Sequence, residues 1–196
     1  MDREAISYLR WTGAPDPERV AVEIVQERVS SLEIRDADSD VLFESEKAPL
    51  SFEEYAQLKA LALKSAEDFL ALYEAVPDKT RSCLPVRQTF YGQVPRTAEQ
   101  MYIHTKSVNS YYFGEIGVEA DNEGSIADCR RRGFAALEAM PDFLANPVVC
   151  GCYDEDWTLR KVLRRFLWHD RIHARAMYRM ACNTFGSKLM PNIFIF

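Results

Sequence analysis

Four segments between residues 52 and 185 carry apolar residues at the three-and-four spacing of a buried helical face. They cover about residues 52–76, 98–113, 126–140 and 157–185. The first two open with capping boxes, Ser51 with Glu54 and Thr97 with Gln100. Four long helices and little strand predict an all-α core arranged as a four-helix bundle.

Proline and glycine mark where these helices end. Pro77, Gly114 and Pro141 follow the first three, and none of the three positions favours continued helix. Residues 78–96 form a long connection that contains Pro85 and Pro95. Such a connection either crosses over a bundle or lines a site, and both uses stay open here.

Residues 1–48 differ from the rest of the chain. A helix-like stretch at 18–25 follows Pro15 and Pro17, and residues 29–44 mix β-branched residues with an Asp-rich turn at 36–40. The pattern predicts a helix and a short hairpin, which form a small N-terminal α/β extension. We therefore divide the chain into an extension, residues 1–48, and a bundle, residues 49–196.

Composition excludes several classes of function. The formal net charge of −6 argues against a nucleic-acid binder, which needs a basic field. The acidic N-terminus and the lack of a long apolar run argue against a secretion signal and a membrane span. Five cysteines, with no Cys-x-x-Cys pair, indicate reduced thiols in a cytoplasmic protein.

The last helical segment carries two histidines one turn apart. His169 and His173 lie on one face, where both imidazoles can bind a single metal ion. They fall within the apolar stripe that contains Phe166 and Met177, so both should point inward. A shared cation would satisfy two buried imidazoles, and a hydrogen-bond network is the alternative.

His104 is the third histidine of the chain, on the second predicted helix beside Met101 and Val108. One ligand from this helix and a pair from the last can converge inside a bundle. Three neutral imidazoles leave coordination positions open, which is typical of catalytic zinc and also suits nickel or ferrous iron.

With these residues in place, the chain resembles the DinB/YfiT-like superfamily of metal-binding bundles. The segment from Trp157-Thr158 to His169-x3-His173 is similar to the family's last helix, and His104 matches its single second-helix ligand. The resemblance covers roughly residues 50–185 and leaves the extension out.

The resemblance implies a divalent metal, with zinc or nickel as first choices and iron or manganese as alternatives. It implies a small-molecule substrate, and we expect a transferase that activates a low-molecular-weight thiol by lowering its pKa. A metal-dependent hydrolase is one alternative. A non-enzymatic bundle that binds metal or mediates protein contacts is another, since fold does not fix chemistry.

Four residues are candidates to assist the metal. Tyr111 and Tyr112 could donate hydrogen bonds to a metal-bound ligand. Asp170 and Glu115 could accept hydrogen bonds from imidazole N–H groups in a second shell.

The sequence also allows predictions for two surface features, an arginine stripe and an apolar tail. An outward stripe of the last helix, formed by Arg160, Arg164, Arg171 and Arg175, predicts a salt-bridged face rather than an anion-binding one. The apolar tail, residues 191–196, should dock back on the core or across an interface, and a homodimer is compatible with it.

Overall fold

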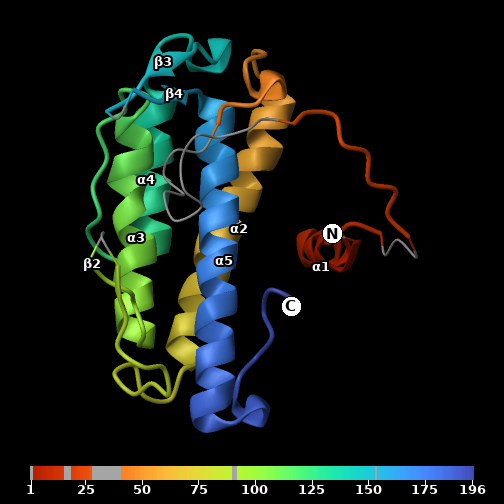
Figure 1. Ribbon diagram of the computed structural model, residues 1–196. Helices are drawn as coiled ribbons and strands as arrows, with labels where there is room; N and C mark the ends of the chain where they lie inside the picture. The colour runs from red at the N-terminus through yellow and green to blue at the C-terminus, as the bar shows by residue number, and fades with distance from the viewer. Residues whose placement is uncertain (1, 16–18, 28–40, 90–91, 153) are drawn as a thin grey trace.

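The computed structural model describes residues 2–15, 19–27, 41–89, 92–152 and 154–196. The chain is mostly helical, and its longest helices lie side by side (Figure 1). These helices are α2 (Phe52–Ala75), α3 (Ala98–Gly114), α4 (Ile126–Glu138) and α5 (Leu159–Phe185). The prediction of an all-α core is confirmed, and within the described ranges no helix is long and apolar enough to cross a membrane.

Each long helix starts at a side chain that accepts a backbone N–H hydrogen bond. This bond satisfies one of the donors that the first helical turn leaves without an intrahelical partner, which stabilises a helix by about 1 kcal/mol. The capping residues, each bonded to the N–H three residues on, are Ser51, Thr97, Ser125 and Thr158. Both predicted capping boxes form.

The N-terminal region differs from its prediction. The helix in this region, α1 (Asp2–Thr12), lies before the predicted helix over 18–25 in the chain. Residues 19–27 have no regular secondary structure. The predicted helix over 18–25 is therefore wrong for its described residues, because Val20, Val22, Ile24 and Val25 are β-branched and favour extended backbone. The predicted hairpin falls largely on residues 28–40, outside the described ranges.

Short elements occupy the connections. Strands β1 (Gln88–Thr89) and β2 (Gly92–Gln93) pair antiparallel before α3, and β3 (Val149–Cys150) and β4 (Asp156–Trp157) pair antiparallel before α5. Three single-turn helices complete the description: η1 (Glu44–Glu46), η2 (Phe143–Ala145) and η3 (Ser187–Leu189).

Two apolar clusters fill the interior, one toward each end of the helices. The first contains Trp11, Phe69, Met101, Met177 and Phe194. The second contains Tyr55, Tyr112, Phe134, Trp157 and Phe166. Burial of such large side chains contributes most of the favourable free energy of folding.

A polar layer separates the two clusters. On every long helix, buried polar side chains stand between residues of the first cluster and residues of the second. The members of this polar layer are Ser65 of α2, Thr105 and Asn109 of α3, Arg130 of α4, and His169 and Asp170 of α5. Buried polar groups are stable only when they are paired, so this layer demands specific contacts.

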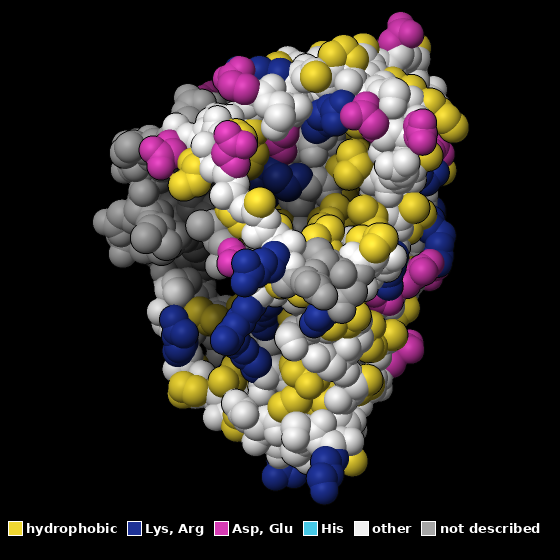
Figure 2. Space-filling model, turned by 90° about the vertical axis from the view of Figure 1, so that its right-hand side faces the viewer, with side chains coloured by type: hydrophobic (Ala, Val, Ile, Leu, Met, Phe, Trp, Pro, Cys, Tyr) yellow, Lys and Arg dark blue, Asp and Glu magenta, His cyan; other side chains and the backbone are white. Residues whose placement is uncertain are grey.

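The arginine side of α5, formed by Arg160, Arg164, Arg171 and Arg175, is paired with acidic residues. Arg160 bonds Glu54, Arg164 bonds Glu46, and both Arg171 and Arg175 bond Glu4 of α1. Figure 2 shows the side of the molecule on which α1 lies, with basic and acidic side chains interspersed. The prediction of a salt-bridged face is confirmed.

The apolar tail returns to its own chain. Phe194 is fully buried, and its ring stacks on Trp11 with centroids 5.4 Å apart. Arg171 Nη1 donates to the carbonyl oxygen of Phe194 at 3.1 Å. Of the two predicted positions for the tail, the structure therefore has the one that docks on the core.

Candidate metal centre

Three imidazoles meet where α3 faces α5. His104 lies in the middle of α3, and His169 and His173 lie one turn apart on α5, so the two helices bring all three together. One nitrogen from each ring lies within 4.8 Å of the other two. This histidine cluster, His104, His169 and His173, could hold a metal ion.

The nitrogen spacing can be compared with a zinc site. Two ligand nitrogens on a tetrahedral zinc with bonds of about 2.0 Å lie about 3.3 Å apart. His104 Nε2 and His173 Nε2 are 3.2 Å apart, and the ring centroids of His169 and His173 are 4.3 Å apart. The rings thus converge as metal ligands do, although the 3.2 Å contact is also a normal hydrogen bond.

Two of the imidazoles are electrically neutral at neutral pH. Burial, followed by the neighbouring His173 and His104, holds the pKa of His169 well below its ordinary value. Burial, followed by His104, lowers the pKa of His173 to about 3. A histidine must be unprotonated to bind a metal, so both residues are already in the binding form.

His169 contains a buried nitrogen that needs a partner. Its Nδ1 atom is shielded from solvent and has no hydrogen-bond partner among the described residues. A buried polar atom in that state carries a free-energy cost of about 1–3 kcal/mol. The cluster thus offers three imidazole nitrogens, and the His169 ring has a buried nitrogen without a hydrogen bond among the described residues. Such a set of donors fits a divalent cation that favours imidazole.

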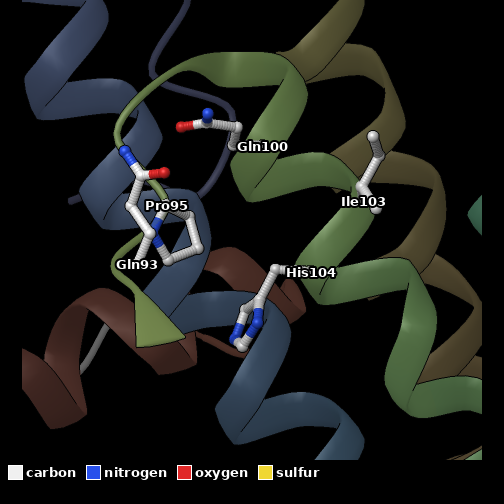
Figure 3. A pocket seen from close by; sticks show the side chains of 5 residues that line it. All are labelled: Gln93, Pro95, Gln100, Ile103 and His104. Carbon is white, nitrogen blue, oxygen red and sulfur yellow. The ribbon is translucent and has the colours of Figure 1, made fainter. Parts of the chain in front are cut away.

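A shallow pocket opens beside His104. It is about 270 Å³ in volume and is lined by Gln93, Pro95, Gln100, Ile103 and His104 (Figure 3). In Figure 3 the ring of His104 extends from α3 toward α5. The connection 78–96 therefore lines the candidate site, one of the two uses predicted for it.

Aromatic and basic side chains cover the cluster toward the start of α5. The ring of Tyr112 meets His169 at 6.0 Å in an edge contact. Arg165, one turn before His169, places its guanidinium 5.3 Å from the Tyr112 ring and 4.8 Å from the Trp168 ring. Tyr112, a predicted helper, thus lies beside the cluster, together with an arginine that the sequence did not single out.

The other predicted helpers lie elsewhere. Tyr111 lies two helical turns after His104, and its ring packs against the rings of Tyr112 and Trp157. Glu115 follows His104 by three helical turns, about 16 Å along the axis, and accepts a hydrogen bond from the Cys152 N–H. Glu115 therefore lies away from the histidine cluster.

Asp170 also differs from its predicted role as an acceptor for an imidazole N–H. Both of its carboxylate oxygens accept hydrogen bonds from Arg130 of α4, at 3.3 Å. Adjacent helical residues project about 100° apart, so His169 and Asp170 cannot both face α3. Arg130 is a functional candidate that the sequence analysis missed, and its position on the apolar stripe of α4 with Ile126 and Leu137 was the available signal.

The fold and the site together define a mostly helical protein with a three-histidine cluster that could hold a metal ion. Comparisons with protein families, with curated proteins and with solved structures find no match for the chain.

Proposed function

We propose that this protein is a divalent-metal enzyme with a DinB/YfiT-like four-helix bundle, and that it transfers a low-molecular-weight thiol to an electrophile. The observation that carries the proposal is the composition of the histidine cluster. It contains three imidazoles and, within the described part of the chain, no cysteine, aspartate or glutamate as a fourth ligand. Three protein ligands leave a position for substrate, whereas a structural zinc site is usually closed by a fourth.

His104, His169 and His173 would hold the cation, with zinc or nickel preferred because imidazole nitrogen suits both. When bound, the cation would act as a Lewis acid that lowers the pKa of a substrate thiol and so favours its more nucleophilic thiolate form. The neutral state of His169 and His173 supports this role, because no proton must leave either ring before binding.

The surroundings favour an anionic sulfur. Arg165 is almost fully buried, and its charge is close enough to contribute to the lowered pKa of His169. A positive charge held in a poorly solvated place stabilises a nearby anion more strongly than it would in water. Arg165, which stacks on Tyr112 and Trp168, would therefore stabilise a thiolate at the cluster.

The pocket beside His104 supports an uncharged co-substrate. Its lining consists of two carboxamides, a proline and an isoleucine in addition to the histidine, and the described residues contribute no formal charge to it. In the transfer, the thiol sulfur forms a bond to an electrophilic carbon. The leaving group departs with its bonding electrons, and the thiol proton passes to solvent.

Elemental analysis tests the metal. Protein purified without chelators should carry about one equivalent of a divalent metal per chain, and His104→Ala and His173→Ala should carry almost none. Ile103→Ala is the matched control, because Ile103 adjoins His104 on α3 but is 56% exposed and offers no ligand. Equal metal content in all four proteins would exclude this site.

Incubation with an electrophilic aromatic and a panel of low-molecular-weight thiols tests the reaction. Turnover with at least one thiol, lost on chelation and restored by metal, is the expected result. Metal binding without turnover of any thiol would exclude the transferase. Cleavage of an activated ester in its place would indicate a metal-dependent hydrolase, and no reaction at all would indicate a non-enzymatic metal site.

A further inference from the structure

Arg130 of α4 is fully buried and is bonded to side chains of the two helices that carry the histidine cluster. Its Nε donates to Asn109 Oδ1 of α3 at 3.2 Å. Its Nη1 and Nη2 donate to the two carboxylate oxygens of Asp170 on α5 at 3.3 Å. Arg130 thus joins α3 to α5, although α4 itself contributes no ligand to the cluster.

The same guanidinium reaches the remaining helix and an aromatic ring. Nη1 lies 3.5 Å from the Ala62 carbonyl oxygen of α2, and the guanidinium carbon lies 3.6 Å from the centroid of the Phe166 ring. Asn109 is held in turn, since its Nδ2 donates to the carbonyl oxygens of Cys129 and Asp121. Arg130 of α4 therefore contacts each of the other three long helices.

Within the polar layer, the direction of Asp170 is linked to the direction of His169. Asp170 directly follows His169, so a bond that fixes the direction of Asp170 toward α4 also fixes His169 about 100° away, toward α3. A rotation of α5 by about 20° would move a ring nitrogen, about 6 Å from the helix axis, by about 2 Å. Metal–ligand distances vary by only about 0.2 Å, so such a rotation would break the site.

We propose that Arg130 is a positioning residue of the metal centre, and that it holds α3 and α5 at the separation and rotation at which the three imidazoles converge. This inference rests on the proposed function, because it assigns Arg130 to the same metal site. Asn109 and Asp170 are the contacts through which Arg130 acts on the two ligand-bearing helices.

The test compares three variants. Arg130→Met combined with Asp170→Leu removes both buried charges together, because removal of one alone leaves the other buried without its partner. Arg130→Lys keeps a positive charge opposite Asp170 but loses the planar fork that also bonds Asn109. Lys161→Met is the matched control, because Lys161 is equally buried on α5 but contacts Glu155 and Asp156 at its N-terminal end.

Two readouts separate positioning from stability. The first is the affinity for Co²⁺ and its visible absorption spectrum, measured on protein shown to be folded by circular dichroism. The second is the nuclear Overhauser effect between the ring protons of His104 and His173 in metal-free protein, which reports a contact of centroids now 4.6 Å apart. Thermal unfolding is recorded for every variant.

In the double variant we expect a folded protein whose Co²⁺ affinity is about 10–100-fold lower, with an altered spectrum and a weakened Overhauser effect. Arg130→Lys should lose less, and Lys161→Met should bind within about twofold of the parent, whatever its thermal stability. A double variant with the parent's affinity, spectrum and Overhauser effect would overturn the proposal.

Failure of the proposed function is distinguishable from failure of this inference. If the parent protein binds no Co²⁺, the metal site is excluded, and the Overhauser effect alone decides whether Arg130 positions the rings. If the double variant does not fold, Asn109→Ala replaces it, because it cuts the link to α3 and leaves the Arg130–Asp170 pair in place. Unchanged affinity and Overhauser effect in folded Asn109→Ala would then overturn the proposal.

Discussion

The two polar sides of α5 differ in how their side chains are satisfied. On the arginine side, Glu54, Glu46 and Glu4 from three earlier segments bond the arginines. On the histidine side, imidazoles contact one another, and His169 keeps a buried nitrogen without a hydrogen bond among the described residues. A polar face that the chain itself completes serves stability, whereas one that lacks a partner is a candidate for function.

The largest expected effect is the stabilisation of the folded protein by bound metal. This stabilisation should depend on the histidine side of α5 and not on the arginine side. Zn²⁺ at about 100 times its dissociation constant should raise the free energy of unfolding by about 2.7 kcal/mol. His173→Ala should abolish this increase, and Arg175→Ala on the other side should retain it. Denaturant unfolding with and without Zn²⁺ measures both, and an equal increase in His173→Ala would contradict the comparison.

A substitution on the arginine side should lower the stability of the protein and leave metal binding unchanged. Arg171 is 7% exposed and donates to Glu4, Ser7 and the Phe194 carbonyl. We expect Arg171→Ala to lower the free energy of unfolding by about 2 kcal/mol, because hydrogen bonds to a charged group are lost, and to leave metal content unchanged. Urea unfolding and elemental analysis check the two parts, and a large loss of metal would show that the sides are not independent.

Acidification should affect only the histidine side between pH 7 and 5.5. An unfolded histidine binds a proton near pH 6.5, but the folded protein holds the pKa of His173 at about 3. The folded state thus binds fewer protons, so stability is greatest above pH 6.5 and falls as the pH drops below it. The pKa of His169 is lowered as well, so for chelator-treated protein we expect each of the two histidines to contribute a loss of about 1 kcal/mol by pH 5.5.

The control for this pH profile is His173→Gln, which lacks one titrating group and should lose stability less steeply. Parallel profiles for the two proteins would mean that His173 is not buried in its neutral form.

The smallest effect is expected at an ion pair on the arginine side. Glu46 bonds Arg164 at 2.5 Å, but Arg164 remains partly exposed to solvent. Glu46→Gln should therefore cost about 1 kcal/mol or less, with metal binding intact. Thermal unfolding at two salt concentrations checks it, since a screened ion pair contributes less at high salt.

The helices could be predicted because their signals are local. Capping side chains such as Ser51 and Thr97 lie within three residues of the groups they bond, and the structure has both boxes. The apolar stripes predicted burial less exactly at the helix ends, where Phe52 is 72% exposed and Met140 is 37% exposed. Periodicity indicates which face is inward, but the extent of the neighbouring helices decides how far burial continues.

The histidine cluster was predictable from the sequence, but the contacts that support it were not. The spacing and the stripe brought His169 and His173 together, and His104 added a third imidazole. The contacts of Arg130 were not predictable, because a charged residue is ordinarily expected in solvent and its bonds to Asn109 and Asp170 join distant parts of the chain. Such long-range pairing depends on the packing of whole helices.

The stacking of Trp11 on Phe194 has a consequence for the order of assembly. During synthesis at about 5–20 residues per second, roughly 10–40 s pass between the appearance of Trp11 and that of Phe194. Over that interval Trp11 is without the ring that covers it in the finished protein. The N-terminal helix should thus be among the last parts to settle, and a nascent chain would leave it open to chaperones and proteases until the tail emerges.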